Sequence, residues 1–128
     1  MIVADTDVLI DFLAGRNPGA EHVALELARG LLRTTAVTRF ELLSGARNTR
    51  QENTIRQLLA AIPTLSLDQP AADLAARVRR NLQKAGESVG MADSLIAGIV
   101  LLHGATLLTR NRRHFERVSG LRLVALTL

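Results

Sequence analysis

The chain has 128 residues, 48% hydrophobic and none of them cysteine, which suits one globular domain (1–128) and excludes disulfide frameworks and thiolate metal sites. A net charge of +4, carried almost wholly by arginine, with only 2% aromatic residues, is compatible with nucleic acid bound through its phosphates and disfavours base stacking on aromatic side chains. The start of the chain has no signal-peptide pattern and no run approaches about 18 apolar residues, so we expect a soluble, cytoplasmic protein without a membrane span.

Short apolar runs alternate along the chain with longer helical patterns. The runs predict five strands, at residues 1–4, 33–37, 64–67, 105–109 and 122–126. The patterns between them predict helices at 7–15, 18–32, 38–47, 50–61, 70–85 and 91–104. Such alternation is typical of an α/β fold with a central, mostly parallel five-stranded sheet and helices on both faces. Ligands bind such sheets beyond the carboxyl ends of the strands.

Oxygen-bearing side chains fall at that carboxyl edge in four separate segments. Asp5 closes the first strand, and Glu41 lies in the first turn of the helix after the second strand. Asp93 begins the most apolar helix, and Thr109 and Asn111 follow the fourth strand. Carboxylates held close together repel one another and raise one another's pKa. A divalent cation bound between them would turn this repulsion into attraction to the metal. Hard oxygen ligands without cysteine or a histidine pair favour Mg²⁺ or Mn²⁺, and hence metal-dependent phosphodiester hydrolysis.

Helix capping is the competing explanation for each of these residues taken singly. Thr38 and Glu41 match a capping box, and Asp93 could cap the helix behind it. A cap can be Ser, Thr or Asn, however, so capping gives no reason for carboxylates to gather at one edge.

Four segments of the chain resemble the PIN-domain ribonucleases, most closely the VapC-type toxins of bacterial toxin–antitoxin pairs. They are VADTDVLIDFLAG (3–15), TAVTRFELLSGAR (35–47), GMADSLIAGIVLLHGATLLTRNRRHF (90–115) and VSGLRLV (118–124). They stand in the family's order and spacing, and the resemblance extends over essentially the whole chain. The resemblance implies a three-layer α/β/α PIN-like fold and a Mg²⁺- or Mn²⁺-dependent endoribonuclease with an acidic pocket.

Three expected catalytic residues follow from the resemblance, residue by residue. Asp5 and Asp93 look like direct metal ligands, and Glu41 is expected to act on the metal through water. Asn111 stands where the family's fourth acid falls. Its amide oxygen can still bind a metal or a water but supplies no charge, which puts binding of a second metal in doubt.

Substrate contacts are expected from hydroxyl groups and arginines around the acids. Thr6 and Thr109 match small hydroxyl positions beside the family's site. Arg110, Arg112 and Arg113 follow the fourth strand, and we expect phosphate contacts from them that position RNA. The alternative is a solvated loop with one or two surface ion pairs.

Neighbouring polar residues have less defined roles. Asp7 replaces the more usual Asn of the opening motif and is expected to cap its own helix. The alternative is that Asp7 contributes to the metal site from outside the direct ligands. Asp11 is expected to face solvent or an arginine. His114 is either a proton donor or a bystander, and Glu116 has no matching family position.

The resemblance also implies a cognate VapB-type antitoxin as inhibitor, a homodimer, and a heterotetramer or larger assembly with the antitoxin. An antitoxin Arg or Lys is expected to be able to enter the acidic pocket. Two alternatives stay open. One is a PIN-like binding module that has lost activity through Asn111. The other is a haloacid-dehalogenase-type phosphatase with Asp5 as nucleophile, Asp7 as acid/base and Lys84 as its only candidate lysine.

Overall fold

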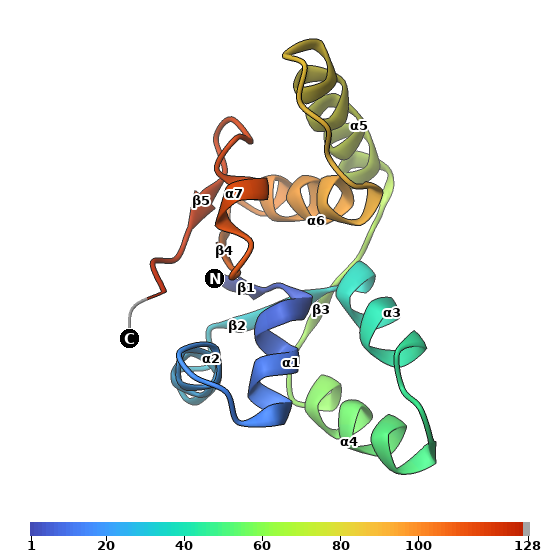
Figure 1. Cartoon of the computed structure of the whole chain (residues 1–128), viewed down its shortest axis with the longest axis vertical. Helices are drawn as coiled ribbons and strands as arrows, with labels where there is room; N and C mark the ends of the chain where they lie inside the picture. The colour runs from blue at the N-terminus through green and yellow to red at the C-terminus, as the bar shows by residue number, and fades with distance from the viewer. Residues whose placement is uncertain (127–128) are drawn as a thin grey trace.

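Five short parallel strands form the sheet at the centre of the computed structural model, which describes residues 1–126 (Figure 1). The strands are β1 (Ile2–Ala4), β2 (Leu32–Thr35), β3 (Thr64–Leu65), β4 (Thr106–Leu108) and β5 (Arg122–Leu123). Their order is β3-β2-β1-β4-β5, and each neighbouring pair is parallel. The chain therefore moves outward from β1 in one direction and returns to its other side with β4. This topological switch lies at the carboxyl end of β1, where parallel sheets bind ligands.

Helices cover both faces of this sheet, as the alternation of patterns predicts. They are α1 (Thr6–Ala14), α2 (Gly19–Ala28), α3 (Ala36–Ser44), α4 (Thr49–Ala60), α5 (Gln69–Lys84), α6 (Met91–Leu102) and α7 (Arg112–Phe115). Figure 1 shows α1, α2 and α4 on one side of the strands and α5, α6 and α7 on the other. No helix within residues 1–126 is long and apolar enough to cross a membrane.

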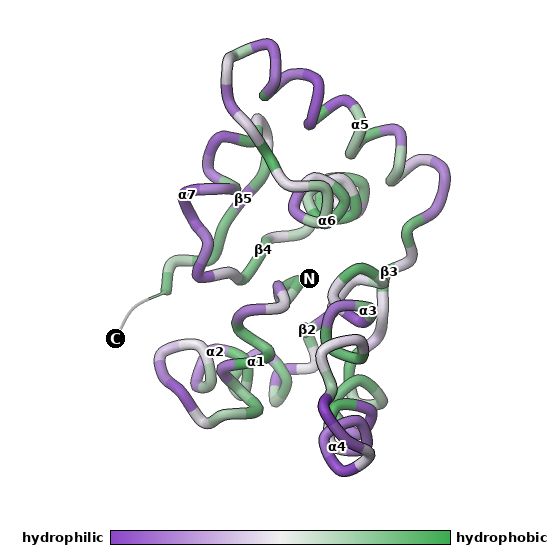
Figure 2. The backbone as a smooth tube through the Cα atoms, turned by 45° about the vertical axis from the view of Figure 1, so that its right-hand side comes forward, coloured by the Kyte–Doolittle hydropathy of each residue, from purple (hydrophilic) through white to green (hydrophobic). Residues whose placement is uncertain are grey.

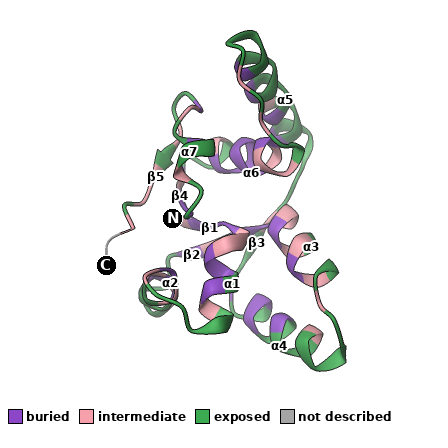
Figure 3. Ribbon diagram, viewed as in Figure 1, coloured by how far each residue is buried: buried purple, intermediate pink, exposed green. Residues whose placement is uncertain are grey.

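Adjacent residues on the central strands explain the three layers. Val3 and Leu107 pack in the cluster under α5 and α6, whereas Ala4 and Leu108 pack in the cluster under α1, α2 and α4. Successive side chains of a strand point to opposite faces, so a continuously apolar strand is buried on both. Figure 3 shows the consequence: buried residues line the inner sides of α1 and α6, while the outer side of α5 is exposed.

The α5–α6 pair has an unusually close crossing. The apolar stripe of α5 includes Ala71 and Ala75, and it faces α6, an apolar helix whose turns are largely green in Figure 2. A Cβ atom at Gly98 would lie only 2.6 Å from the carbonyl oxygen of Ala71 and 2.6 Å from the backbone nitrogen of Ala75. Small residues on both helices therefore allow their backbones to approach.

Some predicted boundaries are wrong, each for a local reason. The helix with Glu41 begins at Ala36, because the cap is Thr35, whose Oγ1 accepts from the backbone nitrogen of Thr38 over 3.1 Å. The capping box at Thr38 is therefore wrong. Leu32, predicted to end a helix, instead pairs with β1 as the first residue of β2. The four-residue helix α7 was not predicted, since one turn is too short to show a helical period.

Candidate active site

Asp5 lies immediately after β1, at the switch point of the sheet, and is only 4% exposed. Its Oδ1 accepts a hydrogen bond from the backbone nitrogen of Thr6 over 2.8 Å and caps α1. Its Oδ2 accepts from the hydroxyl of Thr109, beyond β4, over 2.7 Å. Capping thus accounts for one oxygen of Asp5, while the other belongs to a contact between two strand ends.

The surroundings of Asp5 raise the pKa of its carboxyl group. Burial, followed by the negative charge of Asp7, raises the pKa of Asp5 from 3.8 to about 7, and Asp93 adds to the rise. The hydrogen bonds from Thr109 and Thr6 oppose this rise without cancelling it. Burial also raises the pKa of Asp7. A cation placed between these carboxylates would favour their charged forms.

Asp7 does not cap its helix, so that prediction is wrong. The cap is Asp5, and Oδ2 of Asp7 instead accepts from the backbone nitrogen of Arg110 over 3.0 Å and lies 3.3 Å from Oγ1 of Thr109. Its other oxygen, Oδ1, is buried and has no hydrogen-bond partner within residues 1–126. A buried carboxylate oxygen without a partner is unfavourable, and a bound cation or water would relieve it.

Glu41 reaches the same edge from α3 and is held by the residue that follows Asp5. Oε1 of Glu41 accepts from the hydroxyl of Thr6 over 2.6 Å. The Thr6 hydroxyl also lies 3.1 Å from that of Thr38, a buried residue in the first turn of α3. The hydroxyl of Thr6, expected beside the site, thus orients Glu41; its contact with substrate stays a prediction.

Asp93 stands in the first turn of α6, where the cap is Gly90 and not Asp93. Its Oδ2 lies 3.0 Å from Nδ1 of His114 on α7. His114 therefore lies beside the site, and its role as a proton donor stays a prediction. The sequence signal was weak because α7 is a single turn, so nothing indicated which way His114 would point.

The three expected catalytic acids line one edge but do not form a closed cage. Within the described part of the chain, no three acidic or histidine side chains are grouped closely enough to be a ready metal cluster. The carboxylate of Glu41 is engaged by Thr6 and that of Asp93 by His114. The donor set still fits a hard cation, because it consists of carboxylate oxygens around Asp5 with one partnerless buried oxygen on Asp7.

The loop after β4 supplies the remaining predicted residues. Asn111 is exposed at the start of α7, and its backbone nitrogen donates to Oγ1 of Thr109 over 3.0 Å. Arg110 donates from Nε to Asp11, and Arg112 donates from Nη1 to a backbone oxygen of the C-terminal segment. Arg113 is exposed on α7. Two of the three arginines expected to bind phosphate thus donate hydrogen bonds to other groups of the protein. Asp11 faces an arginine, which is one of its two predicted environments.

Residues 2–121 match the model of the PIN domain family. The chain belongs to this family. The PIN domain is 32% identical over 122 residues to the tRNA(fMet)-specific endonuclease VapC of Shigella flexneri, with 92% of each chain covered. The match confirms the resemblance inferred from the four sequence segments.

Solved structures show the same fold. The crystal structure of DNA-bound VapBC from Salmonella typhimurium aligns with a TM-score of 0.84 at 25% identity, covering 96% of both chains. VapBC2 from Rickettsia felis, bound to a DNA fragment from the promoter, aligns with a TM-score of 0.82 at 20% identity over 97% of this chain and 98% of that one. The predicted three-layer, parallel-sheet fold is therefore confirmed.

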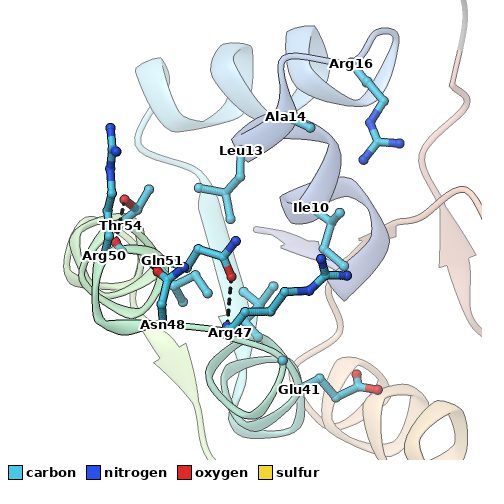
Figure 4. Close-up of a pocket in the computed structure, with 13 residues that line it drawn as sticks. Ile10, Leu13, Ala14, Arg16, Glu41, Arg47, Asn48, Arg50, Gln51 and Thr54 are labelled. Atoms are coloured by element: carbon cyan, nitrogen blue, oxygen red, sulfur yellow. Dashed lines mark hydrogen bonds between the residues drawn. The ribbon is translucent and has the colours of Figure 1, made fainter.

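A groove beside Glu41 is a further feature of this PIN domain that the sequence did not indicate. The groove has a volume of about 820 Å³ and lies between α1, α3 and α4 (Figure 4). Ile10 and Leu13 of α1 are exposed toward it, and arginines stand around it. Its lining includes Ile10, Leu13, Arg16, Glu41, Arg47 and Arg50. An apolar floor with a basic rim suits a segment that carries both apolar and acidic side chains.

Proposed function

We propose that this PIN domain is the toxin of a type II toxin–antitoxin pair, an endoribonuclease that hydrolyses RNA phosphodiester bonds. The observation that carries the proposal is the buried Asp5 at the switch point of the sheet, with Asp7 and Asp93 raising its pKa. Perturbed carboxylates of this kind are typical of catalytic sites. The relatives named as endonucleases and ribonucleases of the VapC type support the same activity.

We infer that the site works with Mg²⁺ or Mn²⁺. Asp5 and Asp93 would hold the ion, Glu41 would assist, and Asn111 is a weaker candidate. Such an ion supplies Lewis-acid stabilisation of phosphate charge and lowers the pKa of water. The support is the chemistry of the donors, which are hard oxygens, and the partnerless buried Oδ1 of Asp7.

The protein's own side chains define how the reaction would proceed. Thr6 and Thr109 hold the carboxylate of Asp5 from two sides and so fix its orientation. Glu41, oriented by the Thr6 hydroxyl, would accept a proton from the attacking water at a carboxylate oxygen. His114, beside Asp93, would donate a proton from its ring to the leaving oxygen.

The substrate that we propose is a structured RNA, with tRNA the first class to test. The Shigella flexneri relative is named as specific for tRNA(fMet). Arg113, exposed on α7, would contact a phosphate of the RNA. The shortage of aromatic residues leaves phosphate contacts and shape as the means of recognition.

The inhibitor that we propose is a VapB-type antitoxin. The groove beside Glu41 has the apolar floor and basic rim that would suit an acidic, amphipathic antitoxin segment. The VapBC neighbours from Salmonella typhimurium and Rickettsia felis support this partner. An antitoxin Arg or Lys entering the acidic site would compete with the metal.

A homodimer, and a heterotetramer or larger assembly with the antitoxin, remain part of the proposal. Phe40 on α3 is 70% exposed and Met91 on α6 is 65% exposed, and both line one hollow of about 330 Å³. A monomer seldom leaves such an apolar patch open to water.

The test of the activity is cleavage of total RNA and of purified tRNA by the protein with Mn²⁺, compared with Asp5→Asn and Asp93→Asn. Cleavage by the wild type and its loss in both variants is the expected result. Equal cleavage by all three would overturn the site assignment. Metal binding without cleavage would favour the inactive binding module. Membership of the PIN family argues against the phosphatase alternative, which trapping of a phosphoenzyme on Asp5 would revive.

A further inference from the structure

We propose that Asp11 and Arg110 form a clamp that positions the β4–α7 loop for catalysis, so that Arg110 acts on the protein and not on RNA. The loop comprises residues 109–111, between β4 and α7. The proposal rests on the nuclease function and adds a positioning pair to it.

The ion pair itself is short and has one buried member. Nε of Arg110 lies 2.6 Å from Oδ2 of Asp11, whose side chain is only 7% exposed. The side chain of Arg110 is 50% exposed, so it covers the acid from the solvent side. A surface ion pair between two mobile side chains has little effect. A buried carboxylate, in contrast, needs its partner, so this pair holds Arg110 in place.

A second contact ties the same loop to the same face of α1. Asp7 and Asp11 are one helical turn apart and therefore lie side by side on α1. Asp7 accepts a hydrogen bond from the backbone nitrogen of Arg110 over 3.0 Å, while Asp11 accepts one from the guanidinium of Arg110. The main chain and the side chain of Arg110 are thus both held by one helix. The loop cannot shift relative to α1 without breaking both contacts.

The start of α2 leaves room for this arrangement. A Cβ atom at Gly19 would lie 2.6 Å from Oδ2 of Asp11 and 3.0 Å from its Cβ. Oδ2 of Asp11 is the atom that accepts the hydrogen bond from Arg110. Any side chain at Gly19 would therefore displace the carboxylate from the ion pair. Gly19 gives a way to disturb the clamp without altering either of its members.

The clamp matters for catalysis because of what the loop carries. The hydroxyl of Thr109, the residue before Arg110, donates a hydrogen bond to Asp5 over 2.7 Å. His114, on the helix that follows, lies beside Asp93. A loosened loop would misplace both the hydroxyl that orients Asp5 and the ring of His114. Small displacements of catalytic groups lower the rate of the chemical step much more than substrate affinity.

The experiment compares Arg110→Met, Asp11→Asn and Gly19→Ala with Arg113→Met, a neighbouring exposed arginine that serves as the matched control. Steady-state cleavage of labelled total tRNA with Mn²⁺ gives kcat and KM. For the three clamp variants we expect kcat to fall between about ten- and a hundredfold, with KM within about twofold of wild type. Arg113→Met should raise KM and leave kcat unchanged.

Coupling and rescue separate the clamp from a general loss of structure. The double variant Asp11→Asn/Arg110→Met should be no slower than Arg110→Met alone, because both changes break one interaction. Arg110→Lys, which keeps the charge, should recover part of the lost kcat. Melting temperatures measured beside the kinetics identify any variant that fails to fold, and Asp11→Asn, nearly isosteric, then carries the test.

A second measurement does not depend on activity. In the metal-free protein, amide hydrogen exchange at Arg110 and Asn111 should be about tenfold faster in the clamp variants and unchanged in Arg113→Met. Unchanged exchange in all of them would overturn the proposal. So would an Arg110→Met variant that raises KM at constant kcat, as an RNA contact would. If the wild type cleaves no tRNA, the proposed function fails for that substrate, while the exchange rates still decide the clamp.

Discussion

The hydroxyl of Thr109 donates to Oδ2 of Asp5 over 2.7 Å and so joins the ends of two neighbouring strands, β4 and β1, at the switch point of the sheet. Both residues are buried. The bond gives the carboxylate a fixed orientation and opposes the rise of its pKa. The geometry of the site therefore depends on a residue with no charge of its own.

Removing this hydroxyl with Thr109→Val should damage both stability and activity. Valine keeps the shape of threonine but leaves Oδ2 of Asp5 without its donor, and loss of a buried hydrogen bond costs about 1–3 kcal/mol. Asp5 would also hold its proton to a higher pH. Urea denaturation and RNA cleavage measure the two effects. Thr109→Ser, which retains the donor, should cleave RNA at close to the wild-type rate; a Val variant as active as the Ser variant would show that the bond is unimportant.

Asp5→Asn should stabilise the metal-free protein at neutral pH while it abolishes cleavage. The pKa of Asp5 is raised from 3.8 to about 7, so the folded state holds the proton more tightly than the unfolded chain. Ionisation therefore favours unfolding as the pH rises from about 4 to about 7, and the effect is constant above that. By linkage, the full difference is roughly 4 kcal/mol. Asparagine is also a good helix cap, so α1 keeps its N-terminus.

The measurement is the free energy of unfolding of wild type and Asp5→Asn between pH 4 and pH 8, in the presence of a chelator. The advantage of the variant should grow across this range. Added Mn²⁺ should raise the melting temperature of the wild type and have much less effect on Asp5→Asn. An advantage that does not change with pH would mean that Asp5 ionises in the folded protein as it does in the unfolded chain.

Gly98→Ala should destabilise the α5–α6 layer. The added Cβ would lie 2.6 Å from backbone atoms of Ala71 and Ala75, so the helices would have to separate. Overpacking of this kind costs about 1–3 kcal/mol, more than the roughly 1 kcal/mol that alanine gains over glycine in helix propensity. Gly90→Ala is the control, because a Cβ atom added there would meet nothing within 4 Å. Thermal unfolding should separate the two variants, and equal melting temperatures would contradict the close crossing.

How much of this could be predicted from the sequence differs between fold and site. Continuous apolar runs and helical periods determine the layers, and the ends of strands place Asp5 correctly. Asp7 was misassigned because its preference for a cap is local, whereas its partner, the backbone of Arg110, is distant. The Asp11–Arg110 pair joins residues 99 positions apart, and no periodicity connects them. Thr35 and Thr38 are both acceptable caps, so only the helix geometry distinguishes them.

Phe40→Ser should convert the proposed dimer into a monomer without unfolding the chain. Phe40 is 70% exposed, so the substitution removes few contacts within one subunit, and surface changes of this kind alter stability by about 0.5 kcal/mol or less. In a dimer joined through α3 and α6, the same change would remove a large apolar contact together with its symmetry mate. Leu25→Ser on α2, another exposed apolar residue, is the control and should leave the assembly unchanged. Analytical ultracentrifugation gives the mass of each species. A wild type that is monomeric, or a Phe40→Ser variant that dimerises as tightly as the control, would show that this patch is not the subunit interface.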